Sequence, residues 1–272
     1  NSITLNNNGA DDGMIIKYSS DGNVQWAKGI GGGSYDYINS VAETSDGGVI
    51  VGGDFESSID LGNGEILTTN RSGYKDGMII KYDSDGTVQW AKGIGGSSNE
   101  RINSVAETSD GGYIAGGYFY SSSIDLGNSI TLNNNGADDG MIIKYDCEGN
   151  AQWAKAIGGS NSDYINSVAE TSDGEIIAGG YFRSSSIELG NGVILTNNGR
   201  YSYDGMIIKY KPVEVPEIVI KQAKGIGGGN YDYINSVAET NDGGYIAGGY
   251  FQSSSIDLGN GEILTTNRSG YK

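Results

Sequence analysis

The decisive stretch is Ile102-Asn103-Ser104-Val105-Ala106-Glu107-Thr108, then Ser109-Asp110-Gly111-Gly112, then Tyr113-Ile114-Ala115-Gly116-Gly117-Tyr118-Phe119. Apolar side chains in its first and third parts recur with period two, which is typical of β-strands rather than helices. The Asp-Gly pair between them supplies the positive φ that a tight hairpin turn needs. The stretch therefore predicts a β-hairpin.

The residues after this hairpin complete a longer pattern. A polar insert of about 20 residues follows, which is long for a connection between strands and contains a short hairpin pattern of its own. Residues 141–145 and 151–157 again have period two and flank a turn at 146–150. The pattern predicts four strands in meander order, and no segment has the apolar periodicity of a helix.

This pattern repeats along the chain. Asp-Gly-Met-Ile-Ile-Lys-Tyr begins at Asp12, Asp76, Asp139 and Asp204, so consecutive copies are 64, 63 and 65 residues apart. We divide the chain into repeats 12–75, 76–138, 139–203 and 204–272, with residues 1–11 as the remnant of a preceding repeat. Residues 1–18 match 128–145, and residues 57–75 match 254–272, at every position. Such identity indicates recent duplication and predicts that the chain derives from a longer array.

Repeated four-stranded units predict an all-β fold, a β-propeller of four four-stranded blades. Three blades would be continuous in sequence. The fourth would combine inner strands from 234–251 with outer strands from 13–30, so that pairing of the N- and C-terminal strands closes the ring and leaves no exposed edge. Alternatively, two chains share blades in a larger ring, so we expect a monomer or a blade-sharing dimer.

The first half of each repeat resembles a WD40 repeat, although the Gly-His and Trp-Asp dipeptides of that family are absent. The chain is more similar to bacterial propeller repeats of the SBBP type, which carry Trp-Ala-Lys-(Gly/Ala)-Ile-Gly-Gly at the outer strand. Here this motif begins at Trp26, Trp90 and Trp153, and the resemblance covers nearly the whole chain. It implies a propeller in an extracellular or surface-attached bacterial protein and carries no active site to transfer.

Composition excludes several classes of function. The chain has 17 basic and 34 acidic side chains, a net charge of −17, no histidine and one cysteine. Such an acidic protein is a poor partner for nucleic acid or an anionic membrane. No apolar run approaches the roughly 18 residues of a membrane helix, and no signal-peptide pattern opens the sequence. Zinc sites of the usual kind, histidine-dependent triads and an internal disulfide are excluded too.

The fourth repeat departs from the others between residues 211 and 224. This segment holds both prolines of the chain, four extra residues, and Gln222 in place of tryptophan. We expect a degenerate outer strand at 218–224, because proline is tolerated at a sheet edge. Trp26, Trp90 and Trp153 are expected to pack between blades rather than to stack on sugars.

Four glutamates recur on the innermost strand: Glu43, Glu107, Glu170 and Glu239. A carboxylate ring near the axis could hold a cation, for which calcium suits oxygen ligands best. The default alternative is an ion pair in each repeat with a lysine, because a half-buried carboxylate needs a partner. The candidate lysines are Lys17, Lys81, Lys144 and Lys209, or Lys28, Lys92, Lys155 and Lys224. No other cofactor is expected.

Loops are the expected place of binding. In propellers, the connection from outer to next inner strand lies on the same face as the connection between second and third strands. The first connection reads Tyr35-Asp36-Tyr37, Asn99-Glu100-Arg101, Ser162-Asp163-Tyr164 and Tyr231-Asp232-Tyr233. Paired tyrosines with polar neighbours are typical of adaptable binding surfaces. The candidate ligand-binding residues are Tyr35, Asp36, Tyr37, Asp163, Tyr164, Tyr231, Asp232 and Tyr233. The acidic position could equally cap the turn.

These patterns predict a non-catalytic recognition module, extracellular or on a bacterial cell surface, that binds glycan or protein through the loop-insert face. One alternative is a structural spacer or display array, which near-identical copies would suit. The other is a carbohydrate-active enzyme that uses carboxylates and tyrosines. A catalytic site would break the repeat symmetry at one place, and the one strong break, residues 211–222, lies in an outer strand. We therefore expect no catalytic residue.

Overall fold

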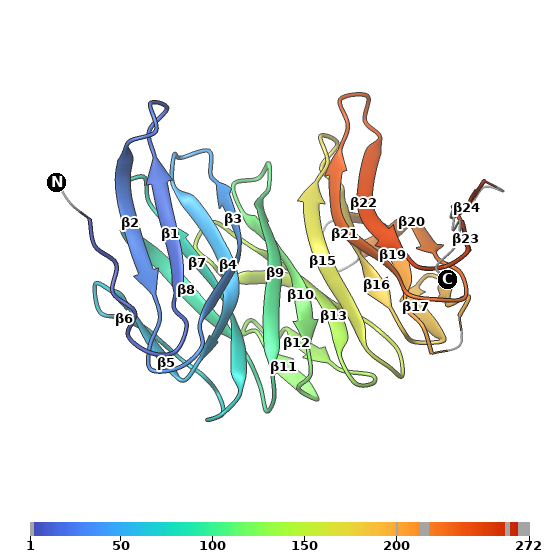
Figure 1. Ribbon diagram of the computed structural model, residues 1–272, viewed down its shortest axis with the longest axis horizontal. Helices are drawn as coiled ribbons and strands as arrows, with labels where there is room; N and C mark the ends of the chain where they lie inside the picture. The colour runs from blue at the N-terminus through green and yellow to red at the C-terminus, as the bar shows by residue number, and fades with distance from the viewer. Residues whose placement is uncertain (1–2, 200, 213–217, 259–261, 266–272) are drawn as a thin grey trace, which may run out of the picture. The chain divides into compact units, whose positions relative to one another are not determined.

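A computed structural model describes residues 3–199, 201–212, 218–258 and 262–265. These residues form β-strands joined by turns and loops, labelled in chain order in Figure 1. The chain divides into two compact units. Compact unit 1 comprises Asn1–Ala115, Phe119–Asn133 and Ile143–Ala154, and compact unit 2 comprises Gly116–Tyr118, Asn134–Ile142 and Lys155–Lys272. Within the described residues, no helix is long and apolar enough to cross a membrane.

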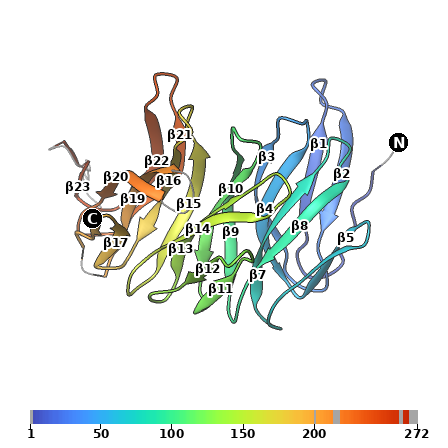
Figure 2. The same cartoon turned by 180° about the vertical axis from the view of Figure 1, so that it is seen from behind.

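Three sheets have four strands each, in the meander order that the repeats predict (Figure 2). The first contains β3 (Tyr37–Glu43), β4 (Val49–Glu56), β7 (Lys75–Tyr82) and β8 (Val88–Ile94). The second contains β9 (Glu100–Glu107), β10 (Tyr113–Phe119), β13 (Asp139–Tyr145) and β14 (Ala151–Ile157). The third contains β15 (Asp163–Glu170), β16 (Ile176–Phe182), β19 (Asp204–Pro212) and β20 (Ile218–Ile226). The all-β class and the repeated four-stranded antiparallel sheets are confirmed.

Each polar insert folds into a short hairpin, as the sequence predicts. The four hairpins pair β5 (Ser58–Gly62) with β6 (Glu65–Thr68), β11 (Ser123–Asp125) with β12 (Thr131–Asn133), β17 (Ser186–Gly190) with β18 (Val193–Thr196), and β23 (Ser255–Asp257) with β24 (Ile263–Thr265). Burial alternates with period two along these strands, since Leu67 on β6 is buried whereas its neighbour Ile66 is exposed.

Two further sheets have only two strands each in the described part of the chain. They pair β1 (Gly13–Tyr18) with β2 (Val24–Ile30), and β21 (Asp232–Glu239) with β22 (Tyr245–Phe251). The sequence of β1 recurs in β13, yet Met14 is 64% exposed while Met141 is fully buried. Likewise Ile246 on β22 is 62% exposed, whereas Ile114 on β10 is buried. Ring closure by pairing of these two sheets stays a prediction.

The first glycine of the Gly-Gly pair on β4 and on β16 allows neighbouring sheets to pack closely. A Cβ atom at Gly52 on β4 would lie 2.7 Å from side-chain atoms of both Ile102 and Val105 on β9. In compact unit 2, Gly179 on β16 has the same relation to Val237 on β21. Any larger side chain would push the sheets apart, so the repeated glycines follow from sheet-on-sheet packing.

Two tryptophans pack against the turn of the next repeat. The ring of Trp26 lies over Gly86, and its Nε1 donates a hydrogen bond to the carbonyl oxygen of Ser84 at 2.9 Å. Trp90 lies over Gly149 in the same way and donates to the carbonyl oxygen of Cys147 at 3.0 Å. Both rings are half-buried. The expected packing between repeats is confirmed for these two side chains.

The degenerate outer strand of the fourth repeat is confirmed. β20 pairs with β19 in antiparallel register, and Gln222 lies opposite Lys209, as Trp90 lies opposite Lys81 in the first sheet. The insertion before it, residues 213–217, lies outside the described residues.

Candidate functional site

The loop before each inner strand and the insert meet at one end of the sheet, which we call the insert end. The backbone nitrogen of Arg183, which follows β16, donates to the carbonyl oxygen of Ser162, which precedes β15, at 3.1 Å. Gln252 and Tyr231 form the same bond in the fourth repeat at 2.9 Å. The sequence prediction that both loops share one face is confirmed within these repeats.

A buried carboxylate ties the two loops together. Asp163 is fully buried, and its Oδ1 accepts hydrogen bonds from the backbone nitrogens of Arg183 and Ser184 at 3.0 and 3.1 Å. Its Oδ2 accepts from the nitrogen of Gly159 at 2.9 Å and from the hydroxyl of Ser184 at 2.6 Å. These four bonds satisfy loop donors that would otherwise be buried without partners.

The equivalent acidic residues also accept hydrogen bonds from the two loops in the other repeats. Asp232 accepts from Gly228, Gln252 and Ser253, and Asp36 accepts from the nitrogens of Gly32 and Glu56. Glu100 accepts from Gly96 and Ser121. Burial raises the pKa of Asp36 and Asp163 and raises that of Glu100 to about 7. These buried carboxylates brace the loops, so among the predicted ligand-binding residues only the tyrosines face the surface.

Five tyrosines of the predicted set lie at the insert end in two kinds of place. Tyr35 and Tyr231 are in the loops and are 48% and 41% exposed. Tyr37, Tyr164 and Tyr233 lie at the starts of inner strands and are half-buried. The hydroxyl of Tyr164 donates to Oδ2 of Asp138 at 2.7 Å, and that of Tyr37 to Oδ2 of Asp11 at 3.0 Å.

Compact unit 2 gathers seven tyrosines at its insert end, which we call the tyrosine cluster. Its members are Tyr118, Tyr164, Tyr181, Tyr203, Tyr231, Tyr233 and Tyr250. Tyr181 is central, with ring centroids 4.9 Å from Tyr164, 5.1 Å from Tyr203 and 4.4 Å from Tyr233. Tyr250 stacks on Tyr233 at 4.6 Å. Mutual edge and face contacts hold these rings in place as a broad aromatic surface.

The hydroxyls of Tyr164, Tyr181 and Tyr233 stay protonated near neutral pH. Burial, followed by the hydrogen bond to Asp138, raises the pKa of Tyr164. Burial also raises the pKa of Tyr181, and raises that of Tyr233 to about 12. These three tyrosines therefore present uncharged rings and hydroxyls, which can stack and exchange hydrogen bonds but cannot act as phenolate bases at neutral pH.

Sequence reasoning missed four members of the cluster: Tyr118, Tyr181, Tyr203 and Tyr250. Three of them precede the last residue of a Gly-Gly-Tyr-Phe motif, where the first repeat has Gly-Gly-Asp-Phe with Asp54. The exchange between aspartate and tyrosine at this position was the feature of the sequence that could have identified these three tyrosines. Strand pairing then places Tyr164 opposite Tyr181 and Tyr233 opposite Tyr250.

The same positions carry charges in the first repeat. Asp54 on β4 is buried, and its Oδ2 lies 3.0 Å from Nζ of Lys75, while its Oδ1 lies 3.1 Å from Nε of Arg101. Arg101 also donates to Oδ1 of Asn39 at 2.6 Å. The ammonium of Lys75 lies 4.0 Å from the ring centroid of Tyr37. An ion network thus stands where compact unit 2 has aromatic rings.

The repeats diverge where these side chains lie. Ile-Asn-Ser-Val-Ala-Glu-Thr is identical in all four copies, and Asp-Gly-Met-Ile-Ile-Lys-Tyr is too. Three insert-end positions instead differ from repeat to repeat. They are Tyr37, Asp54 and Lys75 in the first repeat, Arg101, Tyr118 and Asp138 in the second, and Tyr164, Tyr181 and Tyr203 in the third. This corrects the expectation that the one strong break in symmetry lies at 211–222. A second break is at the insert end.

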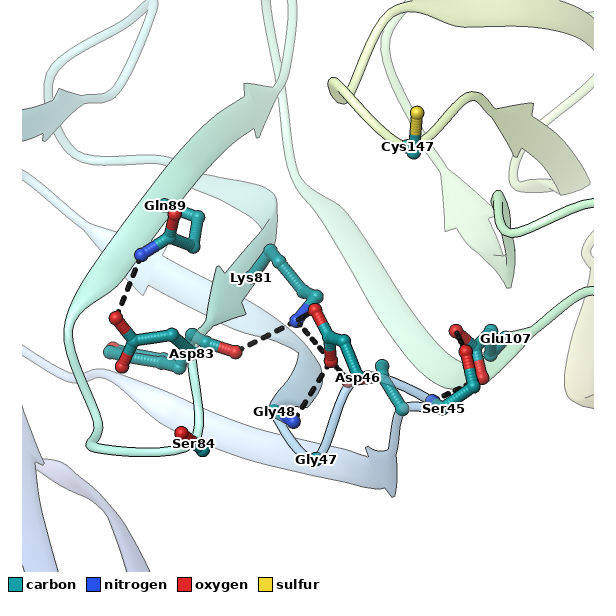
Figure 3. Close-up of polar contacts among 12 residues, drawn as sticks. Ser45, Asp46, Gly47, Gly48, Lys81, Asp83, Ser84, Gln89, Glu107 and Cys147 are labelled. Carbon is teal, nitrogen blue, oxygen red and sulfur yellow. Dashed lines mark hydrogen bonds and ion pairs between the residues drawn. The ribbon is translucent and has the colours of Figure 1, made fainter.

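The recurring glutamates contact turns of the preceding repeat. Glu107 accepts hydrogen bonds from the backbone nitrogen and the hydroxyl of Ser45 at 2.7 and 2.9 Å (Figure 3). Glu239 accepts from the nitrogen and hydroxyl of Ser172 at 2.8 and 2.7 Å. Glu43 is exposed on β3, and Glu170 is half-buried on β15.

The lysines expected to pair with these glutamates have other partners. Nζ of Lys81 lies 2.9 Å from Oδ2 of Asp46 in the hairpin turn (Figure 3), and Lys144 pairs with Asp110 at 2.9 Å. Lys209 pairs with Glu175 at 2.8 Å. The turn supplies the nearer carboxylate, so the glutamate–lysine pairing is corrected for these three lysines. No group of three or more metal-ligating side chains is present among the described residues, and the calcium site stays a prediction.

Comparisons with known proteins agree with a WD-type repeat. No model of a known protein family matches the chain. The chain is similar to an uncharacterized WD repeat-containing protein of Acanthamoeba polyphaga mimivirus, 27% identical over 240 residues, which cover 75% of this chain and 17% of that protein. It is also similar to regulatory protein FlaEY of Caulobacter vibrioides, 26% identical over 154 residues, or 56% of this chain and 16% of that protein.

The resemblance to WD-type repeats is confirmed by the mimivirus relative. The chain spans less than a fifth of the length of either curated relative. A solved structure of a Bacteroides caccae protein of unknown function aligns with a TM-score of 0.38 and 10% identity, over 88% of this chain and 82% of that one. That score is too low to carry an inference.

Proposed function

We propose that the protein is a non-catalytic recognition module that binds a glycan or protein ligand through the tyrosine cluster at the insert end of compact unit 2. The observation that carries this proposal is the pattern of divergence. Two strands of each repeat, Ile-Asn-Ser-Val-Ala-Glu and Gly-Met-Ile-Ile-Lys-Tyr, are identical in all four copies, whereas the insert end changes from an ion network to seven tyrosines. Connecting segments carry binding residues disproportionately, so this change of chemistry at the insert end supports a recognition surface there.

The chemistry of the cluster suits recognition rather than catalysis. Tyrosine offers a large, rigid contact area with a polar tip, and it loses little conformational entropy on binding. Burial raises the pKa of Tyr233 to about 12, so this hydroxyl is protonated at neutral pH, and the nearby acidic residues Asp163 and Asp232 are occupied as loop braces. We assign no catalytic residue.

Closure of a four-bladed ring is part of the proposal. β22 and β1 have the sequences of β10 and β13, which lie side by side in the second sheet. Pairing of β22 with β1 would cover the exposed side chains of Ile246 and Met14. Light scattering with and without a calcium chelator tests this. A monomer supports closure within one chain, a dimer supports blade sharing, and dissociation on chelation supports calcium at the recurring glutamates.

We also propose an extracellular or bacterial cell-surface location, on the resemblance to SBBP-type repeats. The function is tested by retention on arrays of glycans and of peptides, with Tyr231→Ala as the variant and Tyr35→Ala as its matched control. These two tyrosines occupy the same loop position in different repeats. Loss of retention in the first variant alone supports the cluster, and equal retention in both would overturn it.

A further inference from the structure

The first repeat shows what an insert-end tyrosine of this protein can hold. Nζ of Lys75 lies 4.0 Å from the ring centroid of Tyr37 and 5.9 Å from that of Tyr35. The same ammonium is paired with Asp54 at 3.0 Å. Ammonium groups over tyrosine rings are attracted by the negative face of the ring. The two tyrosines are therefore already occupied by a cation from their own chain.

The third repeat keeps the rings and loses that cation. Tyr203 stands where Lys75 stands, and Tyr181 stands where Asp54 stands. Arg183 approaches only one border of the cluster, with its Cζ 6.0 Å from the ring centroid of Tyr203. On the side of the fourth repeat, Tyr231 and Tyr250 are 41% and 50% exposed. This part of the cluster offers ring surface to a ligand.

Charge favours one kind of ligand for these rings. The net charge of −17 attracts cations and repels anions at long range. Asp138 adds a carboxylate beside the cluster, where it accepts the hydrogen bond of Tyr164 at 2.7 Å. A cationic side chain would be attracted by the negative faces of these rings, by the carboxylate at their border and by the net negative charge of the protein.

We propose that the tyrosine cluster binds lysine or arginine side chains of a basic protein segment, which takes over the role that Lys75 has at Tyr37. This inference rests on the proposed recognition function and names its ligand class. The segment would lay its cationic groups over Tyr181 and Tyr203, where the third repeat has tyrosine in place of Lys75, and over the neighbouring exposed ring of Tyr231. Asp138 would add to the local negative potential.

The first experiment is a calorimetric titration of the whole chain with a lysine–glycine repeat peptide. An N-acetyllysine–glycine peptide and an aspartate–glycine peptide of the same length are the controls. We expect the lysine peptide to bind at least about tenfold more tightly than the acetylated one, because acetylation removes the charge. Added salt should weaken binding of the lysine peptide. Equal binding of the lysine and acetylated peptides would overturn the inference.

Matched variants locate the site. Tyr231→Ala removes an exposed ring without touching the sheets and should weaken lysine-peptide binding by about tenfold. Tyr35→Ala removes the equivalent loop ring next to Lys75 and should leave binding unchanged. Tyr233→Phe should retain binding because the ring remains, whereas Tyr233→Leu should weaken it. Equal loss in Tyr231→Ala and Tyr35→Ala would place binding elsewhere and overturn the inference.

The two proposals fail in distinguishable ways. Retention of a glycan that depends on Tyr231, with no difference between lysine and acetyllysine peptides, would overturn the cationic ligand and keep the recognition function. Absence of any retained glycan or peptide that depends on Tyr231 would overturn both.

Discussion

The first and third repeats carry different chemistry at the same three positions. Tyr37, Asp54 and Lys75 form a cation-on-ring contact and an ion pair, whereas Tyr164, Tyr181 and Tyr203 pack ring against ring. Both sets stand at the insert end of sheets that share the sequences Ile-Asn-Ser-Val-Ala-Glu and Asp-Gly-Met-Ile-Ile-Lys-Tyr. The comparison teaches that the buried glycines and acidic braces determine the backbone there, which leaves these three side-chain positions able to change chemistry.

The largest expected effect tests whether the brace is common to both repeats. Asp163→Ala removes the acceptor of four hydrogen bonds and leaves the backbone nitrogens of Gly159 and Ser184 and the hydroxyl of Ser184 without this acceptor, so we expect a loss of about 3–5 kcal/mol in unfolding free energy. Asp36→Ala affects two such donors and should cost about 1–3 kcal/mol. Urea denaturation of both variants checks this, and equal losses would contradict the difference in bonding.

The second repeat extends the comparison, because its brace is a glutamate with a pKa of about 7. Burial raises this pKa above the ordinary 4.5, so the folded chain binds more protons than the unfolded chain between these values. The contribution of Glu100 to stability is then full below about pH 4.5 and is lost as the pH rises through about 7, by on the order of 3 kcal/mol.

Glu100→Gln should remove this part of the pH dependence. The unfolding free energy of the variant should fall less between pH 5 and pH 8 than that of the natural chain. Asp139 and Asp204, whose pKa values burial raises to about 6, keep part of the slope in both. Identical slopes in denaturation series across this range would show that Glu100 does not titrate there.

A smaller effect is expected from breaking the ion network of the first repeat. Asp54→Ala leaves Lys75 and Arg101 without their shared carboxylate, but their side chains are 28% and 40% exposed and can be solvated instead. We expect a loss of about 1–2 kcal/mol. Thermal unfolding checks it, and a loss as large as that of Asp163→Ala would mean that Asp54 is a brace rather than part of a replaceable surface.

The smallest effect concerns a tyrosine that belongs to the core. The hydroxyl of Tyr145 is buried and has no hydrogen-bond partner among the described residues. The hydroxyl of Tyr210, at the same position in the next repeat, is also buried without such a partner. Tyr145→Phe should change the unfolding free energy by less than about 0.5 kcal/mol, or raise it slightly, since removing an unsatisfied polar group costs nothing. A clear destabilisation in denaturant would reveal a partner for this hydroxyl.

Much of the fold was accessible from the sequence because its physical signals are local. Period two around Ile102 and Tyr113 predicts the strands, and Asp-Gly pairs predict the turns. The sequence predicts the outer strand at 218–224 despite the two prolines that precede it. Pairing between the two-stranded sheets depends instead on long-range geometry. Burial of Met141 against exposure of Met14, in identical sequence, shows that local pattern does not settle it.

The candidate site was only half accessible. Tyr164 and Tyr233 were found because they lie in a loop motif with acidic neighbours. Tyr181 was missed because it precedes a core phenylalanine within a strand, and only pairing brings it opposite Tyr164. The sequence alone allowed two roles for Asp163, contact with a ligand or capping of the turn, because a carboxylate suits both. Its burial decides for the cap.

The central claim is that the tyrosine cluster is the recognition surface, and a graft tests it most directly. Tyr181→Asp combined with Tyr203→Lys gives the third repeat the residues of the first. The account predicts that this double variant keeps the circular dichroism and thermal unfolding of a folded β-protein and no longer binds the lysine–glycine peptide in calorimetry. Unchanged peptide binding by the folded double variant would contradict it.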